Sequence, residues 1–264
     1  MGAKIVNVSL LVVVVTVLAG VAIEPATGQV QPTIRWVDAL YGNDSWTGTS
    51  PTFTPPNIGP WKRISHALLQ MSGQQNVIIR VIGRVDVSGA PVRHTNAHEN
   101  GNFPLDVGRK QRIEKDLVNS VGPVIIDGSG VSADLITFGS DGQSTDSFGG
   151  LKNIWVYDAP NAAVYVNPAA NKDVSPAFSG LRFNRCFLGL EIVSKYAAGT
   201  ASPSVQSCYF HNSTDAWDAT GPGNLRAHIS IIASDATRTA SPSITNCTFE
   251  SQYPGRVTDG IYTR

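Results

Sequence analysis

The sequence predicts an all-β protein whose chain winds into a solenoid, a single-stranded right-handed parallel β-helix. Three observations lead to this fold class. Charged residues make up only 15% of the chain while Gly and Pro are frequent, a composition typical of short strands joined by tight turns. One apolar pattern recurs four times in the second half. Val, Ile, Thr and Asn dominate, and patterns of helix length are missing, which disfavours a helical repeat.

The first 28 residues are typical of an export signal. Lys4 precedes an uncharged apolar stretch over residues 10–23, and small residues stand at the spacing of a cleavage site, either Gly20 and Ala22 or Ala26 and Gly28. We therefore expect a signal peptide over residues 1–28 and a secreted or cell-surface protein. The competing interpretation is an uncleaved anchor, because the uncharged run over 5–23 is long enough to span a bilayer.

A strand and a short helix are expected before the coils of the solenoid begin. A strand is expected over Ile34–Val37, and four apolar residues at i, i+3, i+4 and i+7 predict a short helix within about residues 61–72. The coils of the solenoid should then run from about residue 76 to 264, within one domain over 29–264. Residues 91–122 are polar and charged except for 103–107, so we expect excursions from the solenoid wall there, with a short helix near 109–117.

The repeat has the form apolar-x-x-apolar-x-apolar. Its first residues are 27, 27 and 39 positions apart, which places an inserted loop in the third unit. The four units are Leu151, Ile154, Val156; Phe178, Leu181, Phe183; Val205, Cys208, Phe210; and Ile244, Cys247, Phe249.

The spacing within each unit predicts a strand, a bend and a second strand. Two apolar residues separated by one residue lie on the same face of a strand, whereas the three-residue step requires a bend. The residue at the bend is in turn Asn153, Gly180, Ser207 or Asn246, types that tolerate left-handed backbone. Stacked coils would align these units. The alternative is an antiparallel β-sandwich with accidental similarity.

Four further stretches resemble the pectate-lyase-like β-helix superfamily, in particular a bacterial secreted β-helix domain of unknown function. They are GNDSWTGTSP (42–51), PWKRISHALLQM (60–71), FPLDV (103–107) and PVIIDGSG (123–130). The resemblance implies a β-helix from about residue 34 onward and a helix that caps its amino-terminal end. Polysaccharide lyases of this superfamily use an Arg or Lys base and usually calcium held by clustered acids, so calcium is the cofactor the resemblance would imply.

The chain stops three residues after Ile261, the last expected core strand. An uncapped solenoid would expose its core and strand edges. We therefore expect the carboxyl end of the domain to be incomplete, either because the sequence is a fragment or because this end packs on a partner.

The repeat alignment predicts outward columns of side chains. Trp155, Arg182 and Tyr209 occupy one outward position, and Tyr157 and His211 occupy another. Aromatic rings stack on sugar faces and a guanidinium binds carboxylates, so these residues are candidates for substrate binding, with Arg182 and His211 also candidates for catalysis. The alternative is that these side chains only pair across strands and are covered by loops.

Other clusters give weaker signals. Asp127 and Asp158 lie in neighbouring coils with Asp141 and Asp146, which permits a calcium site, although Asp127 and Asp158 are equally explained as turn formers. No paired-carboxylate arrangement of the glycoside hydrolase type can be placed.

Three further groups of side chains each have two possible interpretations. Metal ligation by His94, His98 and Glu99 competes with an ordinary loop, and Asp38, Asn43 and Asp44 are expected to form a turn, with a loop calcium as the alternative. Cys208 and Cys247 share a repeat position and should be inward neighbours, either as thiols or as a disulfide.

The net charge of the chain indicates which partners are not expected. The net charge is zero, so no long-range field attracts nucleic acid or an anionic membrane surface, and no membrane contact is expected beyond the export signal. The leading hypothesis is a secreted β-helix protein that engages a polysaccharide or cell-surface glycan, as a lyase, a hydrolase or a binding protein. The alternative is a non-catalytic adhesin or structural solenoid.

Overall fold

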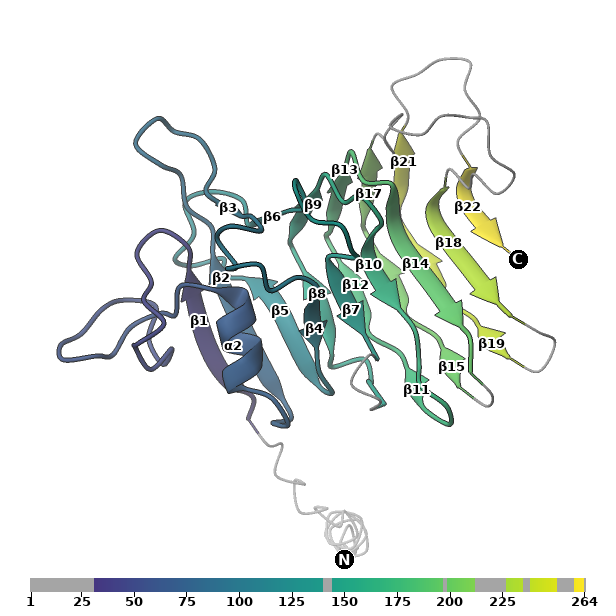
Figure 1. Cartoon of the computed structure of the whole chain (residues 1–264), viewed down its shortest axis with the longest axis horizontal. Coiled ribbons are helices and arrows are strands. Elements are labelled where there is room, and N and C mark those ends of the chain that lie inside the picture. The colour runs from purple at the N-terminus through teal and green to yellow at the C-terminus, as the bar shows by residue number, and fades with distance from the viewer. Residues whose placement is uncertain are drawn as a thin grey trace, which may run out of the picture. The chain divides into compact units, whose positions relative to one another are not determined.

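The computed structural model describes residues 31–139, 144–196, 199–211, 227–234, 238–250 and 259–263. The signal peptide expected over residues 1–28 lies outside them. The described residues form one compact unit that begins at Pro32. They contain one α-helix, and otherwise short strands and turns (Figure 1). None of the described helices is long and apolar enough to cross a membrane.

The strands assemble into four sheets, and every pair of neighbouring strands is parallel. The first sheet contains, in order, β1 (Thr33–Asp38), β2 (Val77–Ile82), β5 (Gln111–Lys115), β8 (Gly150–Lys152), β12 (Ala177–Ser179), β16 (Ser204–Gln206) and β20 (Ser243–Thr245). The second contains β3 (Arg93–His94), β6 (Ile125–Asp127), β9 (Trp155–Tyr157), β13 (Arg182–Asn184), β17 (Tyr209–His211) and β21 (Thr248–Glu250).

The third sheet contains β4 (Leu105–Val107), β7 (Ile136–Phe138), β10 (Ala162–Val166), β14 (Leu188–Ser194), β18 (Ala227–Ala233) and β22 (Asp259–Thr263). A short fourth sheet is formed by β11 (Asp173–Val174), β15 (Thr200–Ala201) and β19 (Thr239–Ala240).

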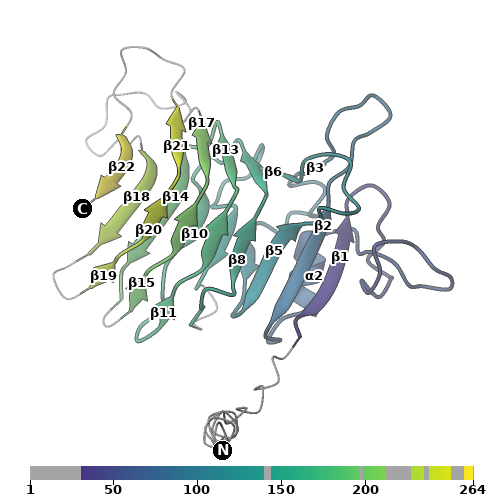
Figure 2. The same ribbon diagram turned by 180° about the vertical axis from the view of Figure 1, so that it is seen from behind.

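The chain visits these sheets in rotation. After β8, β9, β10 and β11, the next strand, β12, pairs with β8, and the same sequence of sheets begins again. Strands of successive turns therefore lie side by side in Figures 1 and 2, with the first sheet in front in Figure 2. The nearly all-β composition and the parallel sheets are consistent with the predicted parallel β-helix.

The bends between the first and second sheets confirm the repeat. Asn153, Gly180, Ser207 and Asn246 all have positive φ, between 52° and 62°. Successive bends are also joined by hydrogen bonds, as when the Gly180 N–H donates to the Gln206 carbonyl. A residue with left-handed backbone conformation bends the chain sharply at a single position. Gly, Asn and Ser occupy this position because they tolerate that conformation.

The apolar residues of the repeats fill one core. Ile154, Leu181 and Cys208 are almost fully buried, and Cys247 packs against the same cluster. The alignment of these equivalent positions confirms the register predicted from the sequence. In the structure Cys208 and Cys247 are free thiols, and burial raises the pKa of Cys208 to about 12.

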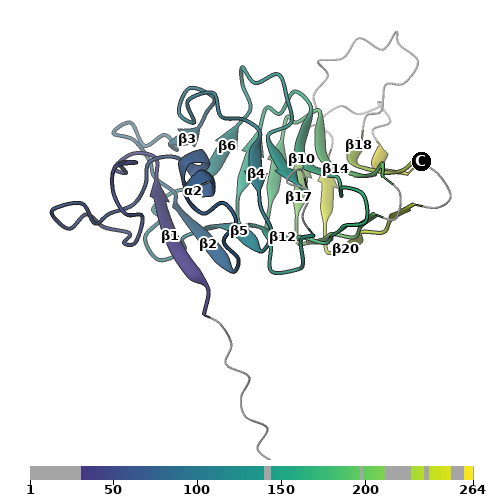
Figure 3. The same cartoon turned by 60° about the horizontal axis from the view of Figure 1, so that its bottom comes forward.

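The helix α2 (Ile64–Gln70) lies inside the range expected for it. Ile64, Ala67, Leu68 and Met71 are buried in the same core cluster, as the helical stripe predicted. The helix contacts β1, β2 and β4, near the amino-terminal end of the sheets (Figure 3).

The polar segment over residues 91–122 differs from expectation in part. The stretch 103–107, which resembles a strand of the β-helix superfamily, contains β4, but β3 and β5 also join the sheets, and a strand replaces the helix expected near 109–117. Ile113 is fully buried in the middle of β5, where it pairs with Ile79 and Leu151 in the neighbouring strands. These pairings with strands distant in sequence override the weak local preference.

Candidate functional site

The outward side of the second sheet carries the candidate site. In β9, β13 and β17 the middle residue of each three-residue strand is buried and the two flanking residues are partly exposed. The flanking side chains of successive coils are aligned by the parallel register. We call this surface the arginine–aromatic face and define it by Trp155, Tyr157, Arg182, Tyr209 and His211.

Arg182 lies between two aromatic rings on this face. Its guanidinium carbon is 5.0 Å from the ring centroid of Trp155 and 5.1 Å from that of Tyr209. The register places Trp155 and Tyr209 directly beside Arg182 on either side. Cation–π contacts of this kind hold the guanidinium in place. No carboxylate pairs with Arg182 among the described residues, and its Nε is buried without a hydrogen-bond partner.

His211 is held by its neighbours on the same face. The Tyr209 hydroxyl donates a short hydrogen bond to Glu250, and the same carboxylate lies 3.4 Å from Nδ1 of His211. The rings of Tyr209 and His211 are nearly parallel, with centroids 5.8 Å apart. Glu250 can therefore fix the ring orientation of His211, as a carboxylate does for an imidazole that transfers protons.

Trp155 and Tyr157 form the other aromatic pair. Their ring planes differ by 7°, and their centroids are 6.3 Å apart. The guanidinium of Arg93 lies over the Tyr157 ring, 5.3 Å from its centroid. The structure thus brings all five predicted residues to one side of one sheet.

Asp127 and Asp158, the two aspartates of the possible calcium site, each form an ion pair with an arginine. Arg93 donates to Asp127 at 2.6 Å, and Arg185 donates to both carboxylate oxygens of Asp158 at 2.7 and 2.6 Å. Burial would raise the pKa of Asp127, but hydrogen bonds from Ser129 and Arg93 outweigh it and lower that pKa. A calcium ion needs six to eight oxygen ligands and is repelled by neighbouring guanidinium groups. These residues do not fit calcium as they stand.

His94, His98 and Glu99 do converge, with candidate ligand atoms within 4.8 Å of one another. Both carboxylate oxygens of Glu99, however, accept backbone N–H groups, from Ile64 and Ser65 at the start of α2. Nδ1 of His94 lies 2.7 Å from the same carboxylate. The cluster therefore attaches the loop after β3 to α2, which explains these side chains without a metal.

The group Asp38, Asn43 and Asp44 forms turns, as expected. Asp38 accepts the N–H groups of Leu40 and Tyr41, and Asn43 accepts that of Ser45. Asp38 and Asp44 also form ion pairs, with Arg84 and Arg63 respectively.

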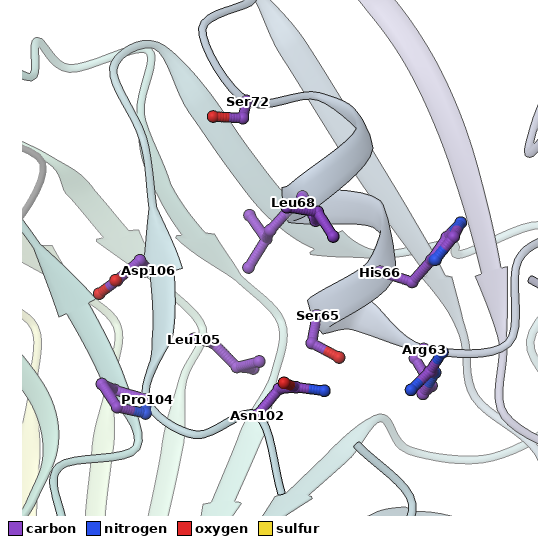
Figure 4. A pocket seen from close by; sticks show the side chains of 10 residues that line it. Arg63, Ser65, His66, Leu68, Ser72, Asn102, Pro104, Leu105 and Asp106 are labelled. Atoms are coloured by element: carbon purple, nitrogen blue, oxygen red, sulfur yellow. The ribbon is translucent and has the colours of Figure 1, made fainter. Parts of the chain in front are cut away.

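A cavity of about 380 Å³ lies between α2 and the residues around β4 (Figure 4). Its polar side chains serve the fold: Arg63 pairs with Asp44, Asp106 accepts from Thr137, and Ser65 bonds to Glu99. The arginine–aromatic face, whose Arg182 guanidinium has no carboxylate partner among the described residues, is therefore the stronger candidate site.

Sequence reasoning missed two residues that border the site. Arg93 lies in a segment expected to leave the solenoid wall, and Arg185 follows a strand without belonging to the apolar repeat. The only sequence signal for Arg185 was its position one coil beyond Asp158, 27 residues earlier, which equals the repeat length.

Comparison with known proteins identifies no family. No protein-family model and no curated protein sequence matches the chain. A search of solved structures finds similarity to a rhamnogalacturonan lyase, with 13% sequence identity and a TM-score of 0.45 over 88% of this chain. The matched region spans 61% of that protein's length, so this chain covers about three-fifths of it. A likeness at this level carries no argument about fold or activity.

Proposed function

We propose that this chain is an exported right-handed parallel β-helix protein that binds an acidic polysaccharide on the arginine–aromatic face. The single observation that supports this most is Arg182, a guanidinium held between two aromatic rings with no carboxylate partner among the described residues. Export through residues 1–28, capping of the solenoid by α2 and membership of the pectate-lyase-like superfamily belong to the same proposal.

The chemistry of the face fits a chain of uronic acid units. A planar guanidinium binds a carboxylate through two parallel hydrogen bonds, and adjacent aromatic rings stack on the apolar faces of sugars. Trp155, Tyr157 and Tyr209 would serve as platforms and Arg182 would bind the carboxylate. Stacked coils repeat such contacts about every 4.8 Å, so an extended polymer can bridge several of them.

A lyase reaction would use the same residues. Arg182 would neutralise the uronate carboxylate, which makes the neighbouring carbon-bound proton easier to remove, and His211 would accept that proton. The electron pair would then form a carbon–carbon double bond as the glycosidic oxygen leaves. The second candidate is a non-catalytic surface protein, favoured because Asp127 and Asp158, the acids expected to hold calcium, are each paired with an arginine.

Binding measurements on Arg182→Gln test the proposal. We expect wild-type protein to bind polygalacturonate and not a neutral glucan. Arg182→Gln should weaken binding about tenfold to a hundredfold, because hydrogen bonds between charged groups contribute about 1.5–3 kcal/mol each. Lys152→Gln, which removes a positive charge at the exposed end of β8 in another sheet, should bind as wild type does.

Two outcomes separate the alternatives. The appearance of unsaturated sugar products, lost in His211→Ala, would assign lyase activity, whereas binding without cleavage would assign a binding protein. The proposal is wrong if no acidic polysaccharide binds, or if Arg182→Gln binds as tightly as the wild-type protein.

A further inference from the structure

A second cavity lies on the third sheet, away from the strands of the arginine–aromatic face. It has a volume of about 350 Å³ and is lined by residues from β10 and β14, by residues before β7, β10 and β14, and by Lys195 after β14. Its lining residues are Asp134, Asn161, Ala162, Tyr165, Phe187, Leu188, Glu191 and Lys195.

The floor of this cavity is apolar. Ala162 and Leu188 form a small cluster that is separate from the main core, and the partly buried rings of Tyr165 and Phe187 pack against it. Ala162 and Leu188 are register partners in β10 and β14, as are Tyr165 and Glu191. Neighbouring coils therefore supply both the apolar floor and the polar groups at its edge.

The polar groups include both donors and acceptors. The Lys195 ammonium donates to the Tyr165 hydroxyl at 3.0 Å and lies over the same ring. Asp134 uses one carboxylate oxygen to accept the Ala162 N–H at 3.1 Å.

Glu191 makes no hydrogen bond or ion pair to the part of the chain that the structure describes. Burial raises the pKa of this carboxyl group, and the charge of Asp134 adds to the effect. The cavity therefore retains hydrogen-bonding capacity that the fold itself does not use.

We propose that this cavity binds a neutral sugar unit, with Glu191 and Lys195 bonding its hydroxyl groups and Phe187 and Tyr165 packing on its apolar face. Concave sites of this kind combine apolar walls with a few convergent polar groups. The two carboxylates outnumber the single ammonium, so the cavity disfavours an anionic sugar. The expected selectivity of this cavity is thus opposite to that of the arginine–aromatic face. The proposal for the cavity does not depend on whether that face binds acidic polysaccharide.

Saturation-transfer NMR and titration with glucose, galactose, mannose and rhamnose test this inference, with galacturonate as the anionic comparison. At least one neutral sugar should bind the wild-type protein. Glu191→Gln should weaken that binding about tenfold, because a hydrogen bond to a charged group is replaced by a neutral one. Phe187→Ala should weaken it further by removing one wall. Asp173→Asn, an exposed acid on β11, should have no effect.

Arg182→Gln separates the two sites. It should weaken polygalacturonate binding about tenfold to a hundredfold and leave neutral-sugar binding unchanged, so either proposal can fail alone. The inference is overturned if none of the four neutral sugars binds, if Glu191→Gln and Phe187→Ala bind them as the wild type does, or if the cavity instead takes up Ca²⁺ in a Glu191-dependent manner.

Discussion

Single residues at the bends determine how each coil turns. Ser207 has a φ of 53°, a left-handed conformation that costs a residue with a side chain about 1–2 kcal/mol. Its equivalent in the preceding coil is Gly180, which adopts this conformation without that cost. The strain at Ser207 is therefore already part of the native state.

Replacing Ser207 with valine should lower the free energy of unfolding by about 1 kcal/mol, because a β-branched residue is the least tolerant of positive φ. Ser207→Gly should change little, since relief of strain offsets the greater flexibility of the unfolded chain. Urea unfolding monitored by circular dichroism measures both. Gln206→Val, at the adjacent exposed strand position, is the control, and an equal loss in Gln206→Val and Ser207→Val would contradict the assignment.

Residue types at the bends were predictable because the constraint is local. Asn153, Gly180, Ser207 and Asn246 were identified from spacing alone, and all four adopt positive φ. The outward columns were predictable for the same reason, since side chains alternate along a strand. The pairing of Asp158 with Arg185, and of Asp127 with Arg93, depended on contacts between distant coils and could not be deduced.

Helix α2 shows how one element depends on another. Its amino-terminal flanking residue, Arg63, provides no side-chain cap, and Glu99 from the loop after β3 accepts the N–H groups of Ile64 and Ser65 instead. Burial would raise the pKa of Glu99, but hydrogen bonds and charge from His94, together with Ser65, lower it to about 2 from 4.5. The ionised carboxylate is therefore the form that the fold stabilises.

The sign of the pH effect follows from this shift. A carboxyl group with a lower pKa in the folded protein contributes stability above its unfolded pKa of 4.5, and that contribution is lost as the pH falls towards 2. Glu99→Gln should lower the free energy of unfolding at pH 7 by about 1–3 kcal/mol, because a neutral amide with one oxygen cannot replace the carboxylate that accepts the N–H groups of both Ile64 and Ser65. The variant should also lose less stability than the wild type between pH 4.5 and pH 2.

Urea unfolding at several pH values checks this prediction, with Asp173→Asn, an exposed carboxylate, as the control. If Glu99→Gln matched the wild type at pH 7, the carboxylate would not be what anchors α2. An equal acid-dependent loss in both proteins would show that Glu99 does not titrate in this range.

The strand β5 shows where element prediction failed. The apolar residues within 109–117 have no clear periodic spacing, and a short helix was expected there. The structure instead places this segment between β2 and β8, where Ile113 is the one buried apolar residue of the strand. A single buried apolar residue is too weak a pattern to identify from sequence, whereas the helical stripe of α2 contains four apolar residues at the helical spacing.

Side chains at equivalent positions of successive coils stack on one another along the described part of the chain. The rings of Phe183, Phe210 and Phe249 are stacked in successive coils, with centroids 4.6 Å and 5.0 Å apart. Each coil contacts mainly its neighbours, so stability should be shared between adjacent coils more than across the full length. This organisation distinguishes a solenoid from a globular core, in which a central residue touches most elements.

Phe210→Ala tests that organisation, because it removes the central ring of the stack. It should lower the free energy of unfolding by about 3–5 kcal/mol, whereas Phe53→Ala, at a half-exposed ring, should cost about 1 kcal/mol or less. The double variant Phe183→Ala/Phe210→Ala should cost less than the sum of the single variants, because the two rings contact each other. Hydrogen exchange should locate the effect: amides of β13, β17 and β21 should exchange faster in Phe210→Ala, while those of β1 and β2 keep their wild-type rates. Uniform acceleration in all strands would instead mean that the coils unfold as one cooperative unit, and the nearest-neighbour account of this protein would be wrong.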